Sequence, residues 1–358
     1  MTRDSCWLPV TSSPAREHDL LVLDLDGVVY VGAAAVPGAV EALRAARRDG
    51  AAWAFVTNNA SRTPAEVGVH LRELDLDVDD AEVVTSSQAG AALAVERVGR
   101  GARVLAVGGV GVEVACREAG LEPVATAADQ PVAVVQGYGR DVAWTHLAEA
   151  TLAVRAGAVW IATNTDLTIP TDRGILPGNG ALVAVVRAAV DVEPLVAGKP
   201  EPGLFTIAAG RAGARHPLVV GDRLDTDIAG AVAAGQRSLL VLTGVTRPDD
   251  LLAAGPHHRP DLLAPDLAGL HVAHPAAIRA GESWVCDGAR VGWRGDRLDG
   301  EAPDGDLAAT NLLRAACAAM WERSDARAGR AASLEVSPRL RERWAGLGAP
   351  ADPVAAWR

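Results

Sequence analysis

Acidic and polar side chains gather in this chain where runs of aliphatic residues end. Each run has the composition of a strand that is buried on both faces of a parallel sheet. In open α/β sheets the carboxyl ends of such strands form the ligand crevice, so residues remote in sequence can share one site. Lys199, in the loop GKPEPG before a predicted helix, can join them. The residues at the strand ends are Asp24 and Asp26, then Thr57 and Asn58, then Asp222, Asp225 and Asp227.

This combination of side chains suits the transfer of a phosphoryl group. Several carboxylates in one crevice repel one another unless a hard cation lies among them, and oxygen ligands suit Mg²⁺. The cation, Lys199 and the backbone amides of residues 26–28 would neutralise the phosphoryl charge. Asp24 can attack phosphorus as a nucleophile, while Asp26 protonates the leaving oxygen and later deprotonates water. Gly27 lets the backbone fold tightly behind these two acids.

The alternation of strand and helix patterns predicts the elements that position these residues. A buried strand over 19–24, a helix over 37–49 and a strand over 52–56 form a βαβ unit, and Ser61 or Thr63 can cap the next helix. A similar alternation fills 202–242. The fold class predicted is α/β, a doubly wound parallel sheet with a Rossmann-like core, an inserted α/β cap domain and a small C-terminal α+β module.

The predicted domain boundaries follow from these patterns. Residues 1–18 form a flexible leader, 19–84 and 195–271 the catalytic core, 85–194 the cap and 272–358 the C-terminal module. In that module an Ala-rich helix over 307–321 carries an apolar stripe that indicates packing. Its stripe comprises Leu312, Leu313, Ala316 and Met320.

Four short segments resemble the motifs of the haloacid dehalogenase superfamily: DLDGVVY, TNN, GKPEP and GDRLDTDI. Their order and spacing match as well, over roughly residues 19–272. The inserted segment, with TNTD at 163–166 and LPGNGALVA at 176–184, is similar to the branch that contains phosphoglycolate, 4-nitrophenyl phosphate and nucleotide phosphatases. The domain order is similar to that of actinobacterial-type glycerol 3-phosphate phosphatases, whose tails have been likened to an acetyltransferase fold.

The resemblance implies a role for each motif residue. Asp24 is the nucleophile, Asp26 the acid and base, and Thr57, Asn58 and Lys199 bind phosphate. Mg²⁺ is held by Asp24, by Asp222 and by Asp26 through its backbone carbonyl. Supporting roles fall to Gly27 and to Asp227, which is expected to brace Lys199 or the metal loop. Asn164 and Asp166 end a predicted cap strand, where they either face the substrate or form a simple turn.

The function expected is Mg²⁺-dependent hydrolysis of a small phosphorylated metabolite through a phosphoaspartate. Glycerol 3-phosphate is the first candidate, with phosphoglycolate, a sugar phosphate or a nucleoside monophosphate as alternatives within the same chemistry. A module that senses a phosphorylated ligand without turnover, and a protein whose phosphoaspartate persists, are the rival classes. Asp26 argues against persistence, because it would speed hydrolysis.

The charge, the apolar runs and the cysteine spacing of the chain exclude several classes of partner and binding site. The chain has 358 residues and a net charge of -11, a field that repels nucleic acid. No apolar run approaches the ~20 residues that span a bilayer, so we expect a cytoplasmic protein without membrane contact, and leave a homodimer open. The four cysteines are too dispersed for a metal pair. VGGVGVE lacks the third glycine of a dinucleotide fingerprint, and His257 and His258 read as loop residues.

Overall fold

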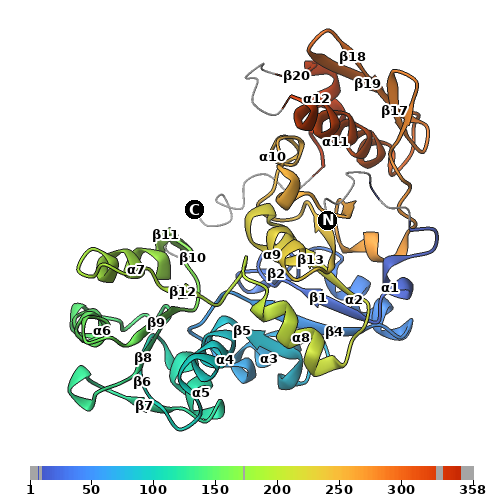
Figure 1. Cartoon of the computed structure of the whole chain (residues 1–358). Helices are drawn as coiled ribbons and strands as arrows, with labels where there is room; N and C mark the ends of the chain where they lie inside the picture. The colour runs from blue at the N-terminus through green and yellow to red at the C-terminus, as the bar shows by residue number, and fades with distance from the viewer. Residues whose placement is uncertain (1–6, 8–9, 172–173, 328–333, 348–358) are drawn as a thin grey trace. The chain divides into compact units, whose positions relative to one another are not determined.

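The computed structural model describes residue 7 and residues 10–171, 174–327 and 334–347. The chain divides into two compact units, one made of 1–52 and 215–353 and the other mainly of 53–214. The domain boundaries given above remain a prediction. Each unit is described separately below, with the element labels of Figure 1.

The first unit contains a parallel sheet in the order β15-β14-β13-β1. Strand β1 pairs in parallel with β13, with Leu23 opposite Val220, and its four residues are fully buried. This agrees with the aliphatic run that predicted it. Helix α2 presents a buried stripe of Ala39, Ala42, Leu43 and Ala46, which is the spacing of one helix face. The elements are α1 (Pro14–Glu17), β1 (Leu20–Leu23), β2 (Tyr30–Val31), β3 (Ala34–Ala35), α2 (Ala39–Arg48), β13 (Pro217–Gly221), the π-helical turn η3 (Leu224–Ile228), α9 (Ala229–Ala233), β14 (Arg237–Val241), α10 (Pro248–Leu252), η4 (Pro256–His258), β15 (Leu262–Ala264) and η5 (Leu267–His271).

The C-terminal part of this unit is a sheet in the order β16-β17-β18-β19-β20 with one long helix packed against it (Figure 1). Its first strands form antiparallel hairpins, and β20 joins β19 in parallel. The sequence predicted an α+β module with this helix, but it did not place the individual strands. The elements are β16 (Ile278–Ala280), β17 (Ser283–Cys286), β18 (Ala289–Arg294), β19 (Arg297–Glu301), α11 (Ala308–Ala326), β20 (Glu335–Val336) and α12 (Pro338–Trp344).

Helix α11 is buried all round from Thr310 to Trp321, more than the single stripe expected from its sequence. It contacts β17 and β18 as well as α10 and β15. One hydrophobic cluster therefore runs from Leu240 and Leu263 of the parallel sheet into the C-terminal sheet and α11. The C-terminal segment completes the core of the first unit.

The sequence predicted a flexible leader over residues 1–18, but residues of this segment that the structure describes are packed against the rest of the first unit. Trp7 is buried, stacks on Trp321 at 5.3 Å between ring centroids, and donates its indole N–H to the carbonyl of Arg314. Val10 forms a backbone bridge with His274. The local sequence could not predict these contacts, because their partners lie some 260 residues or more further along the chain.

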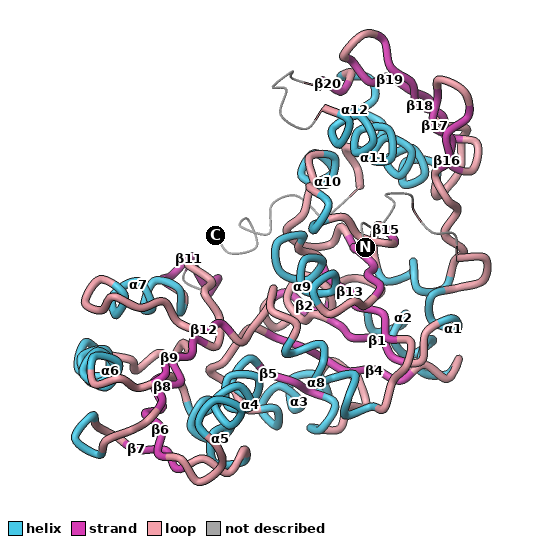
Figure 2. The backbone as a smooth tube through the Cα atoms, in the orientation of Figure 1, coloured by secondary structure: helices cyan, strands magenta, loops and turns pink. Residues whose placement is uncertain are grey.

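The second unit contains the parallel pair β4-β5 and a parallel sheet in the order β12-β9-β8-β6-β7. Helices α4 and α5 pack on one face of that sheet and α6 and α7 lie on the other (Figure 2). Thr63 caps α3 in a capping box with Glu66, as its position predicted. The elements are β4 (Ala52–Thr57), α3 (Pro64–Glu73), η1 (Asp80–Glu82), β5 (Val83–Thr85), α4 (Ser86–Val98), β6 (Arg103–Val107), α5 (Val110–Glu118), β7 (Glu122–Val124), η2 (Ala127–Asp129), β8 (Ala133–Gln136), α6 (Trp144–Arg155), β9 (Val159–Ala162), β10 (Thr168–Thr171), β11 (Gly174–Pro177), α7 (Asn179–Arg187), β12 (Leu195–Val196) and α8 (Gly203–Ala212).

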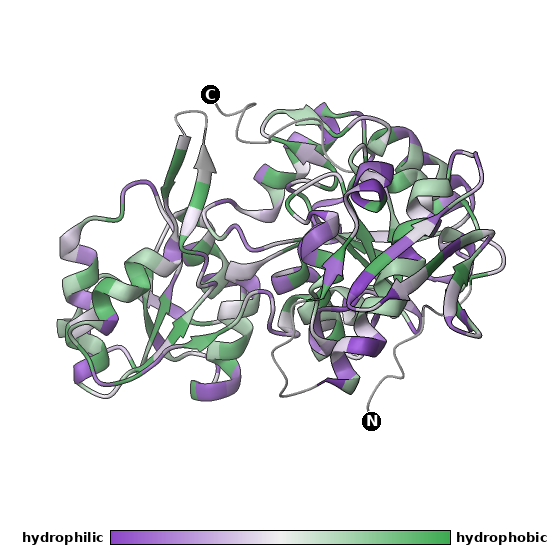
Figure 3. Ribbon diagram, turned by 90° about the horizontal axis from the view of Figure 1, so that it is seen from above, coloured by the Kyte–Doolittle hydropathy of each residue, from purple (hydrophilic) through white to green (hydrophobic). Residues whose placement is uncertain are grey.

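Hydropathy follows these layers: in Figure 3 the inner strands carry the hydrophobic colour and the helices alternate between hydrophobic and hydrophilic bands. Among the described residues, no helix is both long enough and apolar enough to cross a bilayer.

Candidate active site

Asp24 and Asp222 come together because the strands that precede them are neighbours. Asp24 follows β1 and Asp222 follows β13, and the two strands run in parallel and in register. The amide of Asp24 donates to the carbonyl of Val220 at 2.9 Å, so the hydrogen bonding between the two strands continues to Asp24. Both side chains are buried, Asp24 at 8% and Asp222 at 0% exposure. The strand-end argument from sequence therefore holds for this pair.

Asp227 is the third member of this cluster. The π-helical turn η3 turns the chain back so that carboxylate oxygens of Asp24, Asp222 and Asp227 all lie within 4.8 Å of one another. The amide of Arg223 donates to Oδ2 of Asp227 at 3.1 Å and fixes its orientation. Three buried carboxylates at this spacing form an all-oxygen donor set, which fits a hard divalent cation such as Mg²⁺. Sequence reasoning gave Asp227 only a supporting role.

Two glycines make room for the Asp222 carboxylate. Its Oδ2 accepts the amide of Val245 at 2.6 Å, and a Cβ on Gly244 would lie only 1.9 Å from that same oxygen. A Cβ on Gly27 would lie 2.9 Å from it, and Gly27 also has a φ of +85° that side chains rarely adopt. Thr243 holds the loop by donating to the Gly27 carbonyl at 2.6 Å. Gly27 therefore serves both the turn and the packing of Asp222.

Asp26 lies in the tight turn after β1. It is exposed, unlike Asp24, and its residue forms a backbone bridge with Tyr30. The amide of the following Gly27 donates to the Tyr30 carbonyl at 2.8 Å, which closes the turn. Asp26 thus stands two residues from the buried carboxylate cluster with access to water, as an acid and base requires.

Asp225 does not belong to the carboxylate cluster. Its two oxygens accept a bidentate pair of hydrogen bonds from Arg223 at 2.8 and 3.1 Å. Those hydrogen bonds hold the pKa of Asp225 below its ordinary value. His257 and His258 lie in the short helix η4, and the metal-ligand groups found among the described residues do not include them. Asp225 and His257 are exposed, and His258 is partly buried.

Thr57, Asn58 and Lys199 lie in the second unit, at the end of β4 and in the loop before α8. Thr57 and Lys199 are buried, at 3% and 4% exposure, and the Thr57 hydroxyl oxygen accepts the amide of Asn59 at 3.0 Å. That contact leaves the hydroxyl proton of Thr57 free to be donated. The Asn58 carboxamide bonds the main chain of Lys199 at two points.

Comparisons with known proteins agree with this arrangement. The profile of the haloacid dehalogenase-like hydrolase family matches residues 21–122, and a second HAD-hydrolase-like profile matches 196–270. D-glycerol 3-phosphate phosphatase of Mycobacterium tuberculosis is 45% identical over 331 residues, which is 91% of this chain and 90% of that protein. The chain belongs to the haloacid dehalogenase-like hydrolases. The family inferred from the four motifs is thereby confirmed.

Other relatives of this hydrolase are also named as phosphatases. Acid sugar phosphatase of Staphylococcus aureus is 39% identical over 66% of this chain and 91% of its own. The crystal structure of the M. tuberculosis glycerol phosphate phosphatase in complex with magnesium has a TM-score of 0.83 at 42% identity, covering 94% of this chain and 99% of that one. A 4-nitrophenylphosphatase of Thermotoga maritima gives 0.66 at 32% identity, over 72% and 97% of the chains. These structures confirm the fold class. The likeness of the C-terminal module to an acetyltransferase fold stays a prediction.

In this hydrolase the predicted cap residues Asn164 and Asp166 form a hydrogen-bonded turn. The Asn164 side chain donates to the Asn58 carbonyl at 2.7 Å and accepts the amide of Asp166 at 3.1 Å. Asn179 of α7, which sequence reasoning missed, donates to the Asn164 carbonyl at 2.7 Å. Of the two alternatives given for Asn164 and Asp166, the turn is present in the structure. Contact of these residues with substrate stays a prediction.

Gly109 and Gly111 have a packing role in the second unit. A Cβ on Gly109 would lie 2.8 Å from the carbonyl oxygen of Ser61, and one on Gly111 would lie 2.5 Å from that of Arg62. The amide of Gly111 also faces the Ser61 carbonyl at 3.4 Å. The two glycines let the start of α5 approach the loop after β4, which explains them without a dinucleotide.

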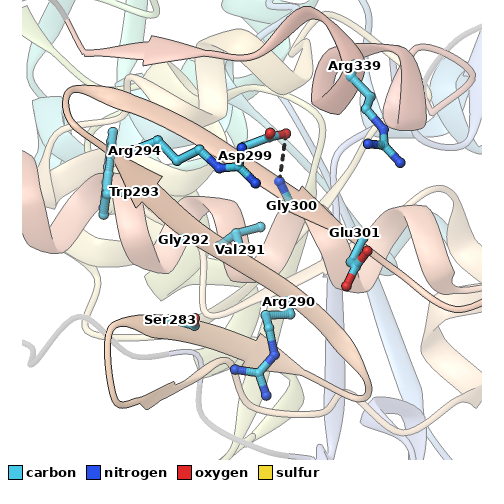
Figure 4. Close-up of a pocket in the computed structure, with 10 residues that line it drawn as sticks. All are labelled: Ser283, Arg290, Val291, Gly292, Trp293, Arg294, Asp299, Gly300, Glu301 and Arg339. Atoms are coloured by element: carbon cyan, nitrogen blue, oxygen red, sulfur yellow. Dashed lines mark hydrogen bonds between the residues drawn. The ribbon is translucent and has the colours of Figure 1, made fainter.

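The C-terminal sheet of the hydrolase carries a hollow of about 260 Å³ on one face (Figure 4). Gly292 separates Ser283 and Asp299 on the neighbouring strands, so the middle of the hollow lacks a side chain on β18. Arg290 stands directly opposite Glu301 in the β18-β19 register. Charges of both signs therefore alternate around this hollow, which is typical of a solvated sheet face.

Proposed function

We propose that this chain is a Mg²⁺-dependent phosphomonoesterase that hydrolyses glycerol 3-phosphate. The observation that carries the proposal is the buried cluster of Asp24, Asp222 and Asp227 at the ends of β1 and β13, with carboxylate oxygens within 4.8 Å of one another. Buried carboxylates this close are mutually repulsive without a cation. The magnesium complex of the M. tuberculosis relative supports Mg²⁺ as that cation.

Asp24 is the nucleophile in this proposal. A carboxylate oxygen of Asp24 bonds to phosphorus, the bond from phosphorus to the ester oxygen breaks, and Asp26 gives its proton to the departing alcohol. Asp26 then takes a proton from water as the water oxygen attacks phosphorus, which releases phosphate and restores Asp24. Mg²⁺ would offset negative charge on the phosphoryl oxygens. Its ligands would be Asp222, Asp24 and either the Asp227 side chain or the Asp26 carbonyl.

Thr57 and Lys199 bind the phosphoryl group in this proposal. Both are buried residues with a donor group, one a hydroxyl and the other an ammonium, at the ends of elements in the second unit. Such donors lower the barrier when they are oriented before the reaction begins.

The choice of substrate rests on the relatives. A protein 45% identical along most of both chains is named a D-glycerol 3-phosphate phosphatase, and a shorter relative at 39% is named an acid sugar phosphatase. We therefore rank glycerol 3-phosphate first and sugar phosphates second, with phosphoglycolate and nucleoside monophosphates behind them. A cytoplasmic location and the absence of nucleic acid or membrane partners remain predictions.

The test is phosphate release from a panel of these esters, with Mg²⁺ or with a chelator. We expect release that requires Mg²⁺, is lost in Asp24→Asn, and gives the highest kcat/KM for glycerol 3-phosphate. Asp225→Asn is the matched control, because it makes the same change at an acid of the metal loop that pairs with Arg223 instead. A higher kcat/KM for a sugar phosphate would overturn the substrate, and no release from any ester by folded protein would overturn the hydrolase activity.

A further inference from the structure

The side chain of Asn58 is bonded to the main chain of Lys199 at two points. Its Oδ1 accepts the Lys199 amide at 2.8 Å, and its Nδ2 donates to the Lys199 carbonyl at 3.1 Å. The carboxamide therefore satisfies both the N–H and the C=O of Lys199, as a paired residue does in an antiparallel sheet. The amide of Lys199 can only donate and its carbonyl can only accept, so these contacts also fix which end of the Asn58 carboxamide is oxygen.

The remaining contacts of Asn58 reach residues of the segment 85–194, the predicted cap. The second Nδ2 proton of Asn58 is donated to Oδ2 of Asp166 at 3.2 Å. The backbone carbonyl of Asn58 accepts a hydrogen bond from the Asn164 side chain at 2.7 Å. Ser86, at the start of α4, donates to that same carbonyl at 2.6 Å. Asn58 therefore joins the loop after β4, the turn after β9 and the Lys199 loop.

Close packing holds this arrangement in place. A Cβ on Gly198 would lie 2.6 Å from Oδ1 of Asn58 and 2.3 Å from the carbonyl oxygen of Thr163. Any side chain at position 198 would thus push the Lys199 loop off both neighbours. Lys199 and Asn164 are each only 4% exposed, so water cannot readily replace the hydrogen bonds that Asn58 provides.

We propose that Asn58 is a positioning residue that couples the placement of Lys199 to the cap residues Asp166 and Asn164. This rests on the proposed function, in which Lys199 binds the phosphoryl group. Both Nδ2 protons of Asn58 are used in the contacts above, so its side-chain amide has no proton left for a phosphate oxygen. The phosphate-binding role expected for Asn58 from the motif is thereby replaced by a role through Lys199.

Two substitutions separate the contacts at Asn58. Asn58→Ala removes every side-chain hydrogen bond. Asn58→Asp keeps an acceptor for the Lys199 amide but sets a carboxylate oxygen against the Lys199 carbonyl and the Asp166 carboxylate, where Nδ2 donates in the native chain. We expect kcat/KM to fall by roughly a hundredfold in both, the loss that a displacement of about 1 Å can cause. The apparent dissociation constant of inorganic phosphate should rise in the same variants.

A readout that does not depend on turnover is amide hydrogen exchange at Lys199 in phosphate-free protein. The Lys199 amide should exchange faster in Asn58→Ala than in the native chain, because its acceptor is gone. If Asn58 instead contacted phosphate directly, exchange at Lys199 without phosphate would be unchanged, and the proposal would be overturned.

The cap contact has its own conservative pair. Asp166→Asn keeps an oxygen that can accept from Asn58, whereas Asp166→Ala removes it. We expect Asp166→Ala to weaken inorganic phosphate binding roughly tenfold, as the loss of one charge-assisted hydrogen bond allows, and Asp166→Asn to restore most of it. Thr165→Ala, at the exposed neighbouring position, is the matched control. If Asn58→Ala does not fold, this pair still tests the proposal, because Asp166 is only partly buried. Equal phosphate binding in both Asp166 variants and the native chain would overturn the coupling.

Lys199→Ala distinguishes a failure of this inference from a failure of the proposed function. If Lys199→Ala keeps native turnover, Lys199 does not bind the phosphoryl group and the proposed function is wrong on that point. If Lys199→Ala is inactive while Asn58→Ala matches the native chain in phosphate binding and amide exchange, the hydrolase stands and the positioning role is refuted.

Discussion

Arg314 is the residue whose replacement best tests how the C-terminal segment is fixed to the first unit. Its guanidinium is 1% exposed and donates to Oδ1 of Asn311 at 2.7 Å, to the Leu263 carbonyl at 2.5 Å and to Nδ1 of His274 at 2.9 Å. Leu263 belongs to β15 and Arg314 to α11, so these hydrogen bonds join the parallel sheet to the C-terminal helix.

Arg314→Met keeps the length and apolar stem of this side chain but removes the three hydrogen bonds. Each buried acceptor left without a donor costs about 1–3 kcal/mol. The native chain also bears the unfavourable free energy of taking the guanidinium charge out of water. Arg314→Met removes that term, which offsets part of the lost stability. We expect the free energy of unfolding to fall by about 3 kcal/mol, measured by urea unfolding at pH 7.5 with tryptophan fluorescence.

The pH dependence of the same variant tests the contact with His274. Burial, and then the charge of Arg314, lower the pKa of His274 from 6.5 to about 4 in the folded chain. The other charged groups that act on it are Arg237 and Glu17. Between pH 6.5 and 4 the unfolded chain binds a proton at this position and the folded chain does not, so stability falls on acidification. At about 1.4 kcal/mol for each unit of pKa difference, the loss reaches about 3 kcal/mol at pH 4.

Without the Arg314 charge the pKa of His274 should rise, so Arg314→Met should lose less stability than the native chain between pH 6.5 and 4. The control is Arg341→Met, which breaks an exposed ion pair with Asp249 at 3.4 Å and should cost less than about 1 kcal/mol. If Arg314→Met were no less stable than Arg341→Met, and its pH dependence matched that of the native chain, the reasoning about this buried contact would be refuted.

Four further predictions concern the metal site, the packing around it and the fold. Gly244→Ala places a Cβ 1.9 Å from Oδ2 of Asp222, so phosphate release should be lost at any Mg²⁺ concentration, and native activity would contradict the packing argument. Asp227→Asn should raise the Mg²⁺ concentration for half-maximal activity roughly tenfold or more; an unchanged titration curve would exclude Asp227 as a ligand. Gly210→Ala, exposed within α8 with open space around it, should raise stability by about 0.5–1 kcal/mol, seen as a higher Tm without a change in kcat. Deletion of the chain after Leu270 should yield insoluble protein, because it uncovers the shared core around Leu240 and Leu263; a folded, active truncation would show that the C-terminal segment is dispensable.

Much of the candidate site could be predicted because it depends on local sequence. An aliphatic run followed by Asp24, and another followed by Asp222, predict parallel strands with acids at their ends, and the structure pairs β1 with β13 in register. The capping box of Thr63 and Glu66 is local in the same sense, since its partners are three residues apart. Predictions from such patterns agree with the structure because the residues that form the pattern lie in one strand or helix and are brought together by it.

Other features are absent from any local pattern. The C-terminal segment was predicted as an α+β module, but the positions of the short strands β16–β20 were not, because tryptophan, arginine and glycine interrupt the alternation on which a strand prediction depends. The burial of α11 on all sides could not be read from its single apolar stripe, since alanine is compatible with either a buried or an exposed face. Asp227 was assigned a supporting role because the residues between it and Asp222 do not by themselves indicate the π-helical turn that brings its carboxylate close to Asp24 and Asp222.

The sequence by itself determined the order of the elements, the family and the identity of the acids at the strand ends, because periodicity and motif spacing are properties of neighbouring residues. Only the tertiary structure decided that Asp227 joins the buried oxygen cluster, that Asn58 is bonded to Lys199, and that Arg314 of α11 donates a hydrogen bond to β15. Asn58 and Lys199 are 141 residues apart and Arg314 and Leu263 are 51 apart. Such contacts depend on where whole elements pack, and a linear pattern holds no record of that packing.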